Sequence, residues 1–222
     1  MTSVESSSNV WKRESRAGFA LVWGLMVVSL SMGCGGVPKT AYYTLGTPPA
    51  PSPGGAKTAA VLGVEHLRAP LALRDDRVLY YQSATQMNFY QYSRWGADPA
   101  TMLTEYAAQW LGSSGAFAQV CILPSRQRVD YTLGGTVLSF EEVDYGGGTK
   151  ARVGLDLFLT RTLDRKVIWT GKQHVDAPLQ GGGVEGVATA LSDSTSQLLR
   201  AMTPGLIAQV EQDFKASAGQ TH

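Results

Sequence analysis

Alternating apolar and polar positions predict β-strands in the second half of the chain. Apolar residues occupy every second position from Val153 to Leu159, and charged or hydroxyl side chains stand between several of them. This period of two is typical of an antiparallel strand with one buried face. Segments 129–143 and 167–175 have a similar character, and short turns separate them from this strand. The pattern therefore predicts a three-stranded meander.

The first strand of this meander contains a change of phase. Its apolar side chains stand at odd positions up to Leu133 and at even positions from Leu138. The change falls beside Gly134 and Gly135, which predicts a β-bulge at the two glycines.

Further strands are expected earlier in the chain. Residues 58–67 and 117–123 are apolar runs of the buried-strand type, and residues 76–95 read as two aromatic strands joined near 83–85.

Two segments have the period of an amphipathic helix. In residues 98–112, Asp98 is suited to the N-cap, Pro99 to the first turn and Gly112 to the end. A second apolar stripe runs from Val184 to Phe214, where Pro204 and Gly205 predict a break or a kink and so a helix pair.

The order of these elements predicts the fold class. Strands, a helix, a meander and further helices favour a single α+β domain, with an antiparallel or mixed sheet and helices packed on one face. We expect this domain to cover residues 58–215, and residues 216–222 to form a disordered tail.

The first 33 residues resemble a secretory signal peptide. A polar, basic start is followed by the apolar run 19–30 and then by small residues around Cys34. The run is too short for a membrane-spanning helix, which needs about 20 apolar residues. Gly33 stands before the cysteine as in a lipobox, although Ser31 replaces the usual apolar residue. We therefore expect cleavage before Cys34 and lipid attachment to its side chain.

Two alternatives for the cysteines stay open. An ordinary signal peptide cleaved nearby would leave Cys34 as a free thiol. A disulfide would join Cys34 to Cys121, which lies in an apolar segment typical of a core strand.

Residues 34–57 are interpreted as a lipidated tether and spacer. Residues 46–57 are rich in proline and glycine, a composition that does not bury apolar surface. Extended at roughly 3 Å per residue, they would span about 36 Å. The preceding segment 41–45 is either a strand or a docking peptide.

Charge and composition exclude several functions. The chain has 19 Lys and Arg and 18 Asp and Glu, and residues 1–33 hold three of the former and two of the latter. A chain that begins at Cys34 is therefore neutral, which argues against nucleic-acid binding. The two cysteines and three histidines share no metal-ligand spacing, so no metal or other cofactor is expected.

No motif indicates catalysis. The segment 140–145 carries Glu141, Glu142 and Asp144, but it closes a strand beside a glycine turn, where a solvated charged tip is expected. The chain also lacks a G-x-S-x-G nucleophile elbow. We therefore expect a protein that is not an enzyme.

Aromatic residues concentrate between positions 80 and 110. Strand alternation places about half of them in the core and turns the others outward, where they suit a protein interface or an apolar ligand. Arg94 and Trp95 stand just before the first helix, as a structural corner or as an interface anchor.

Several motifs together resemble a known family. The sequence YYTL at 42–45, the proline-rich spacer and the segment RWGADPATML at 94–103 follow a lipobox in the expected order. In this order and spacing the chain resembles the ABC-type transport auxiliary lipoproteins, the PqiC/YmbA-like family, over roughly residues 34–215.

The resemblance implies a non-enzymatic periplasmic α+β domain tethered to the outer membrane. It implies as partner an MCE-domain (mammalian cell entry) protein that spans the periplasm, with an ABC permease and ATPase as indirect partners. It also implies a homo-oligomeric ring that receives the partner's tube and supports membrane integrity. We expect the interface to include Tyr42, Tyr43, Leu45, Arg94 and Trp95.

Two alternative functions are considered. The first is an independent lipoprotein that binds a lipid or small apolar ligand in a closed apolar cavity. The second is a periplasmic hydrolase with a dispersed site, which no sequence motif supports.

Overall fold

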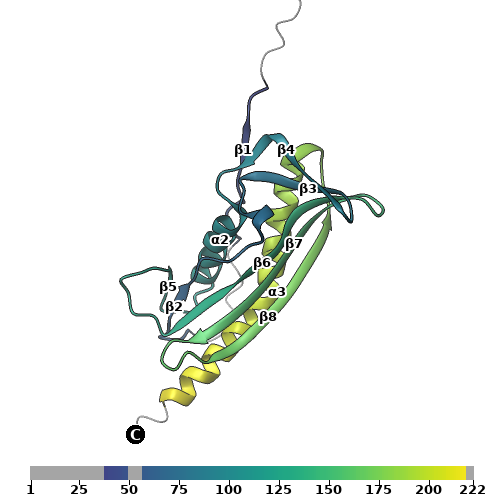
Figure 1. The fold of residues 1–222 in the computed structure, drawn as a ribbon. Coiled ribbons are helices and arrows are strands. Elements are labelled where there is room, and N and C mark those ends of the chain that lie inside the picture. The colour runs from purple at the N-terminus through teal and green to yellow at the C-terminus, as the bar shows by residue number, and fades with distance from the viewer. Residues whose placement is uncertain (1–37, 50–56, 219–222) are drawn as a thin grey trace, which may run out of the picture. The chain divides into compact units, whose positions relative to one another are not determined.

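Two α-helices pack on an eight-stranded mixed sheet (Figure 1). The structure is a computed structural model that describes residues 38–49 and 57–218. The strands are β1 (Ala41–Tyr43), β2 (Val61–Val64), β3 (Arg77–Ser83), β4 (Gln86–Trp95), β5 (Gln119–Ile122), β6 (Tyr131–Asp144), β7 (Thr149–Arg161) and β8 (Val167–Pro178). The helices are η1 (Leu71–Leu73), a single 3-10 turn, and the α-helices α2 (Pro99–Ser113) and α3 (Gly183–Ala218).

Strand β6 organises the sheet. Along one edge it pairs antiparallel with β7, which pairs antiparallel with β8. Along its other edge it pairs parallel with β2 near Tyr131 and parallel with β3 near Glu142. Strand β5 extends the sheet beyond β2, and β4 and β1 extend it beyond β3. The two groups of short strands therefore attach to opposite ends of β6.

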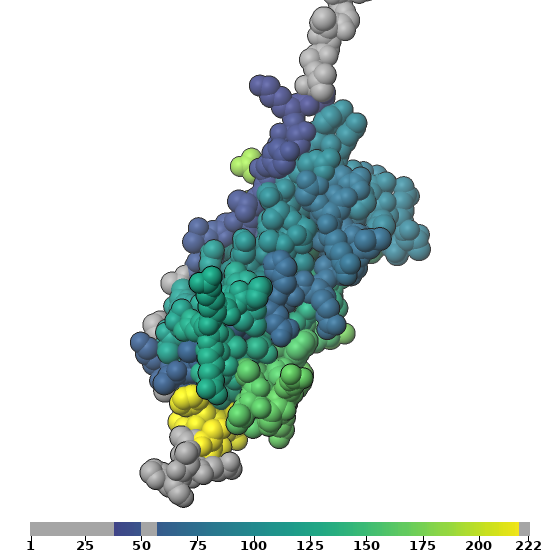
Figure 2. Space-filling view, turned by 60° about the vertical axis from the view of Figure 1, so that its left-hand side comes forward, coloured from purple at the N-terminus to yellow at the C-terminus, as the bar shows by residue number. Residues whose placement is uncertain are grey.

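The two ends of the sheet are named by their chain segments. The β1 end holds β1 and the adjoining part of β4, and the far end holds residues 122–131, 161–167 and 211–218. At the far end, Thr162 donates a backbone hydrogen bond to Asp130 over 2.9 Å, and the phenol of Tyr131 reaches Asp213. Figures 1 and 2 show the far-end segments gathered where the yellow end of α3 lies.

The meander and the aromatic hairpin agree with the sequence pattern, but the predicted bulge is misplaced. Gly134 and Gly135 pair regularly with Phe158 and Leu157, and the register shifts only between Val137 and Ser139. Leu138 is the extra residue, and its side chain is 40% exposed rather than buried. The two glycines are needed for a different reason, which is that β7 comes close to them across the pair.

Helix α2 begins as predicted, but it continues past Gly112 to Ser113, and Ser114 is its C-cap. Asp98 is its N-cap and accepts a hydrogen bond from the backbone of Thr101 over 3.1 Å. Helix α3, by contrast, does not break at Pro204. It runs for 36 residues through that proline, so the predicted helix pair is one helix, and it includes residues 216–218 of the predicted tail.

Both helices pack on the sheet and against each other, which confirms the predicted α+β fold. Inward side chains of β7 alternate as expected, and Val153, Leu155, Leu157 and Leu159 are all buried. The hydroxyl groups of Tyr106 in α2 and Ser196 in α3 lie 2.6 Å apart, which joins the two helices. The core between them contains Trp110, Leu191 and Leu198, which are fully buried.

Candidate functional site

The N-terminal segment 41–45 is part of the sheet. Strand β1 pairs in parallel with β4, with Ala41 opposite Ser93 and Tyr43 opposite Trp95. Leu45 is only 9% exposed and belongs to the hydrophobic core. Of the two interpretations of this segment, a strand or a docking peptide, the structure shows the strand.

The proline-rich segment 46–57 is held on the domain at both ends. The amide of Gly46 donates to Ser192 Oγ in α3 over 3.0 Å. At the other end, the amide and the hydroxyl of Thr58 both donate to the Ala116 carbonyl, over 2.8 and 3.0 Å. The segment thus connects two fixed points of one domain and does not lengthen the tether, in contrast to the expected reach of about 36 Å.

The predicted interface residues have different environments. Tyr42 is 68% exposed on β1, and Tyr43 is half-buried. Trp95 is 1% exposed and packs on Phe140, with ring centroids 5.2 Å apart. Of the proposed side chains, Leu45 and Trp95 are therefore core residues and offer no accessible surface in this chain.

Arg94 does not stack on its neighbour Trp95 but forms an ion pair with Asp76 over 2.5 Å. Among the aromatic residues of the 80–110 region, Tyr92 is exposed, whereas Tyr106 and Trp110 lie in the core. The predicted lipid-attachment residue, Cys34, lies outside the described residues. Cys121 is half-buried on β5, an edge strand, and is free rather than a core residue.

A groove runs between the segment 43–49 and helix α3. Its volume is about 660 Å³, and Tyr106 of α2 contributes to its floor. The α3 side carries charged and amide side chains, namely Glu185, Asp193, Gln197 and Arg200. The sequence pattern did not reveal this groove, because its two walls are more than 130 residues apart in the chain.

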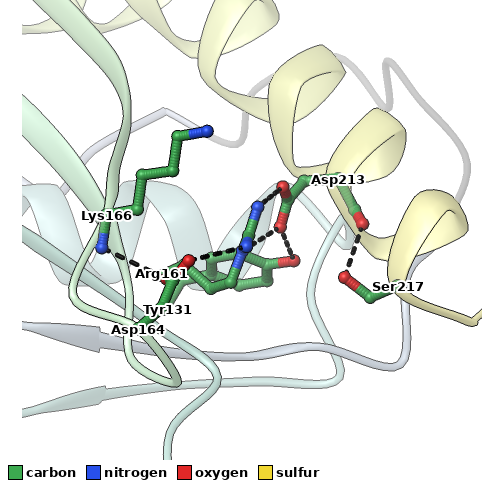
Figure 3. Close-up of polar contacts among 6 residues, drawn as sticks. All are labelled: Tyr131, Arg161, Asp164, Lys166, Asp213 and Ser217. Atoms are coloured by element: carbon green, nitrogen blue, oxygen red, sulfur yellow. Dashed lines mark hydrogen bonds and ion pairs between the residues drawn. The ribbon is translucent and has the colours of Figure 1, made fainter. Parts of the chain in front are cut away.

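A buried ionic cluster joins the sheet to α3 at the far end (Figure 3). The phenol of Tyr131 donates to Asp213 Oδ2 over 2.9 Å, and Arg161 donates to both carboxylate oxygens of Asp213. Arg161 also pairs with Asp164 over 3.0 Å. The hydrogen bonds from Arg161 hold the pKa of Asp213 below its usual value, and burial raises the pKa of Tyr131.

This cluster borders a second cavity. The cavity has a volume of about 370 Å³ and lies between the β5–β6 connection, the β7–β8 turn and the end of α3. It combines cationic, anionic, hydroxyl and apolar groups, and its lining includes Arg128, Asp130, Tyr131, Arg161, Leu163 and Phe214.

Of the three carboxylates in the 140–145 segment, Asp144 is exposed beside the glycine turn as expected, but the two glutamates are not part of a solvated tip. Glu141 and Glu142 are 7% and 6% exposed, because both lie within the paired part of β6. Glu142 accepts a hydrogen bond from the Tyr90 phenol over 2.8 Å, and Glu141 accepts one from the Phe140 amide over 2.7 Å. Burial raises the pKa of Glu141 to about 7. Both groups are engaged in hydrogen bonds within the sheet.

The described residues contain no group of three or more His, Cys, Asp or Glu side chains placed to hold a metal ion. Within residues 38–49 and 57–218, neither α-helix has the length and hydropathy that a bilayer span requires.

Comparison with known proteins gives the family. The profile described as the ABC-type transport auxiliary lipoprotein component matches residues 43–203. The chain belongs to this family. The match begins at Tyr43, the last residue of β1, and covers every later strand, together with α2 and more than half of α3. No curated protein sequence matches the chain.

Two solved structures share the fold of this auxiliary lipoprotein. A crystal structure of a Xanthomonas campestris protein assigned to DUF330 is 20% identical, with a TM-score of 0.71, and covers 79% of this chain and 99% of its own. A crystal structure of an uncharacterized protein is 19% identical, with a TM-score of 0.61, over 77% and 99% of the two chains. A PelC dodecamer from Paraburkholderia phytofirmans is more distant, at 17% identity, a TM-score of 0.42 and 66% and 89% coverage.

Family membership defines the general role. The auxiliary lipoprotein is a component of an ABC-type transport system, and lipoproteins of such a family are anchored to a membrane by an attached lipid. The family is defined by transport and is not a class of enzymes.

Proposed function

We propose that this auxiliary lipoprotein is anchored to the periplasmic face of the outer membrane and docks an MCE-domain lipid transport tube. In this proposal residues 1–33 are the signal peptide and Cys34 carries the lipid, palmitate among its acyl chains. An ABC permease and its ATPase at the inner membrane are the indirect partners. The protein acts by adhesion and positioning rather than by catalysis, and it supports membrane integrity.

The position of β1 is the observation that supports this mechanism best. Because β1 is hydrogen-bonded to β4 from Ala41 onward, only residues 35–40 separate the proposed lipid from the folded domain. Six residues span about 20 Å when fully extended. The domain is then held close to the membrane by its β1 end.

The β1 end supplies the most accessible of the predicted interface residues. Tyr42 is 68% exposed, and Arg94, its partner in the β1–β4 pair, is half-buried. Exposed tyrosine and arginine are common at protein interfaces. We assign the contact between neighbouring copies in a homo-oligomeric ring to this surface, with Tyr42, Tyr43 and Arg94 as its residues.

A pull-down of the tagged chain from detergent-solubilised membranes tests the partner. We expect mass spectrometry to identify an MCE-domain protein and to find Cys34 as the acylated N-terminus of the bait. A bait that is unlipidated, or that is recovered without an MCE-domain protein, would contradict the proposal.

A Cys34→Ser chain with a cleavable signal peptide tests the anchor separately. This protein is expected to fold and to reach the periplasm but to leave a deletion strain sensitive to detergent. Full restoration of detergent resistance by the secreted form would mean that the lipid anchor has no role in function.

The 660 Å³ groove suggests a second candidate function, which is binding of a lipid by the protein itself. Its volume is suited to a small ligand, but its α3 wall is charged at Glu185, Asp193 and Arg200. A lipid acyl chain prefers an apolar lining, so we favour the docking role. Native mass spectrometry of the purified chain distinguishes the two, because a stoichiometric bound lipid is expected only for the second function.

A further inference from the structure

Exposed cations gather at the far end of the sheet. Arg126 and Arg128 lie in the β5–β6 connection, and Arg165 and Lys166 lie in the β7–β8 turn. The backbone hydrogen bond from Thr162 to Asp130 holds the two segments together. All four residues are exposed, and none forms an ion pair within the described part of the chain.

The nearby aspartates are already engaged. Asp213 and Asp164 both pair with Arg161. Asp130 accepts a hydrogen bond from the Val61 amide over 2.8 Å. Asp164 and Asp213 share one cation, Arg161, and the far-end segments together carry six Lys and Arg against four Asp and Glu, which leaves an excess of two positive charges. This is a local excess of positive charge on a domain that is otherwise close to neutral.

Apolar side chains are exposed beside the cations. Leu163 is 84% exposed at the tip of the β7–β8 turn, Val167 is 49% exposed, and Ile122 on β5 is 39% exposed. Leu163 also lines the 370 Å³ cavity, together with Phe214 of α3 and Arg128. A cavity of this size accommodates one or two side chains, and of the four exposed cations Arg128 lines it directly, beside Asp130.

We propose that the far end docks an acidic peptide segment of a periplasmic partner, which places an apolar side chain in the 370 Å³ cavity and carboxylates on the surrounding cations. This inference rests on the proposed function, because it assigns the partner contact to the end of the domain that points away from the anchor. Exposed cations beside exposed apolar groups match the charge and shape of such a segment.

The position of this surface favours a protein over a lipid surface. Helix α3 has 36 residues and is therefore about 54 Å long, and its C-terminal turns form part of the far end. Gly46, just after β1, bonds to Ser192 in the first third of the same helix. Most of the length of α3 thus separates the far end from the anchored β1 end, as Figure 1 shows.

Peptide binding to the full, lipidated chain in detergent micelles tests the chemistry. The probe is a fluorescent twelve-residue peptide of alternating Glu and Leu pairs, and the comparison peptide has Lys in place of Glu. We expect binding of the Glu peptide only, weakening as salt is raised, and a loss of about tenfold in the Arg128→Glu/Lys166→Glu chain. Lys172→Glu is the matched control, since Lys172 is an exposed cation on the solvent face of β8 and lies outside the far end.

Three results would overturn the assignment. They are equal binding of both peptides, equal loss in the Lys172→Glu control, and tighter binding to vesicles of phosphatidylglycerol than to the Glu peptide. The vesicle result would mean that the cations contact a membrane.

Site-specific photo-crosslinking in cells tests the location. A benzoylphenylalanine at Leu163, 84% exposed, is compared with one at Leu71, which is 83% exposed in the 3-10 turn between β2 and β3. We expect a crosslink to the MCE-domain protein from position 163 and none from position 71. A crosslink from position 71 or from Tyr42 alone would refute the far end as the docking surface but would leave the proposed function intact. If no position crosslinks and the pull-down contains no MCE-domain protein, the proposed function itself fails.

Discussion

The indole nitrogen of Trp110 in α2 donates a hydrogen bond to Thr203 Oγ1 in α3 over 2.9 Å. Both side chains are buried, and the Thr203 hydroxyl in turn donates to the Leu199 carbonyl over 2.7 Å. This chain of bonds ties the two helices together at the residue before Pro204. Its position explains how α3 continues through a proline, because the helix there is held by α2 as well as by its own backbone.

Replacement of Pro204 by alanine is expected to stabilise the domain. Proline in a helix interior lacks the amide for one helical hydrogen bond and costs about 3 kcal/mol relative to alanine. Pro204 is exposed, so its removal leaves no cavity. We expect the Pro204→Ala chain to gain roughly 1–3 kcal/mol in its free energy of unfolding, measured with urea. Unchanged or reduced stability would mean that the packing of α3 depends on the proline.

Helix α2 and the end of α3 show what local sequence can and cannot predict. Asp98 and Pro99 are local signals, and they place the start of α2 correctly. Pro204 is also a local signal, yet the break that it predicts is absent, because buried contacts from α2 and the sheet outweigh the lost hydrogen bond. The change of phase in β6 correctly predicts a bulge in this strand, but the bulge lies at Leu138 rather than at Gly134 and Gly135.

The two glycines of β6 give a second prediction. A Cβ at position 135 would clash with the Asp156 carbonyl oxygen and would lie only 2.6 Å from Leu157 Cδ2. Because a backbone atom of the paired strand does not move freely, Gly135→Ala is expected to lower the free energy of unfolding by roughly 2–3 kcal/mol.

Gly112→Ala is the matched control for Gly135→Ala. The atom nearest to a Cβ built at position 112 belongs to Val120, at 3.9 Å. Gly112 lies inside α2, where alanine is favoured over glycine by about 1 kcal/mol. The two variants should therefore shift the urea midpoint in opposite directions. Equal midpoints would show that β6 and β7 adjust to a side chain at position 135.

The candidate surfaces were only partly predictable. The exposure of Tyr42 and the burial of Leu45 and Trp95 all depend on the pairing of β1 with β4, more than 40 residues away. The cluster of Tyr131, Arg161 and Asp213 joins three elements separated by 30 to 82 positions. No local pattern in a single sequence indicates such a contact.

This cluster gives a third prediction. Asp213→Ala leaves the buried Tyr131 phenol without its acceptor and Arg161 without its main partner. Loss of hydrogen bonds to a charged group costs about 1.5–3 kcal/mol, so we expect a loss of roughly 2 kcal/mol in urea unfolding. Tyr131→Phe should cost about 1 kcal/mol, because only one bond disappears.

A double-mutant cycle separates the Tyr131–Asp213 bond from general damage. The Asp213→Ala/Tyr131→Phe chain is expected to lose less than the sum of the single losses, since the two side chains share one hydrogen bond. Asp193→Ala, at an exposed position of the same helix, is the control and should stay within about 0.5 kcal/mol of the parent. Strict additivity would mean that the phenol and carboxylate do not interact in solution.

Buried Glu141 makes the stability of the domain depend on pH. Burial raises the pKa of its carboxyl from 4.5 to about 7 in the folded chain, so the folded state binds this proton more tightly than the unfolded state does. The contribution of Glu141 to the free energy of unfolding is therefore most favourable below pH 4.5 and is lost as pH rises towards 7, by roughly 2–3 kcal/mol.

A glutamine at position 141 still accepts the Phe140 amide hydrogen bond without a charge. We expect Glu141→Gln to be about 1–3 kcal/mol more stable than the parent in urea at pH 8 and nearly equal to it at pH 5. Glu105→Gln, on the exposed face of α2, should keep the parent's pH dependence. If both variants follow the parent at every pH, the Glu141 carboxyl titrates as an ordinary surface group.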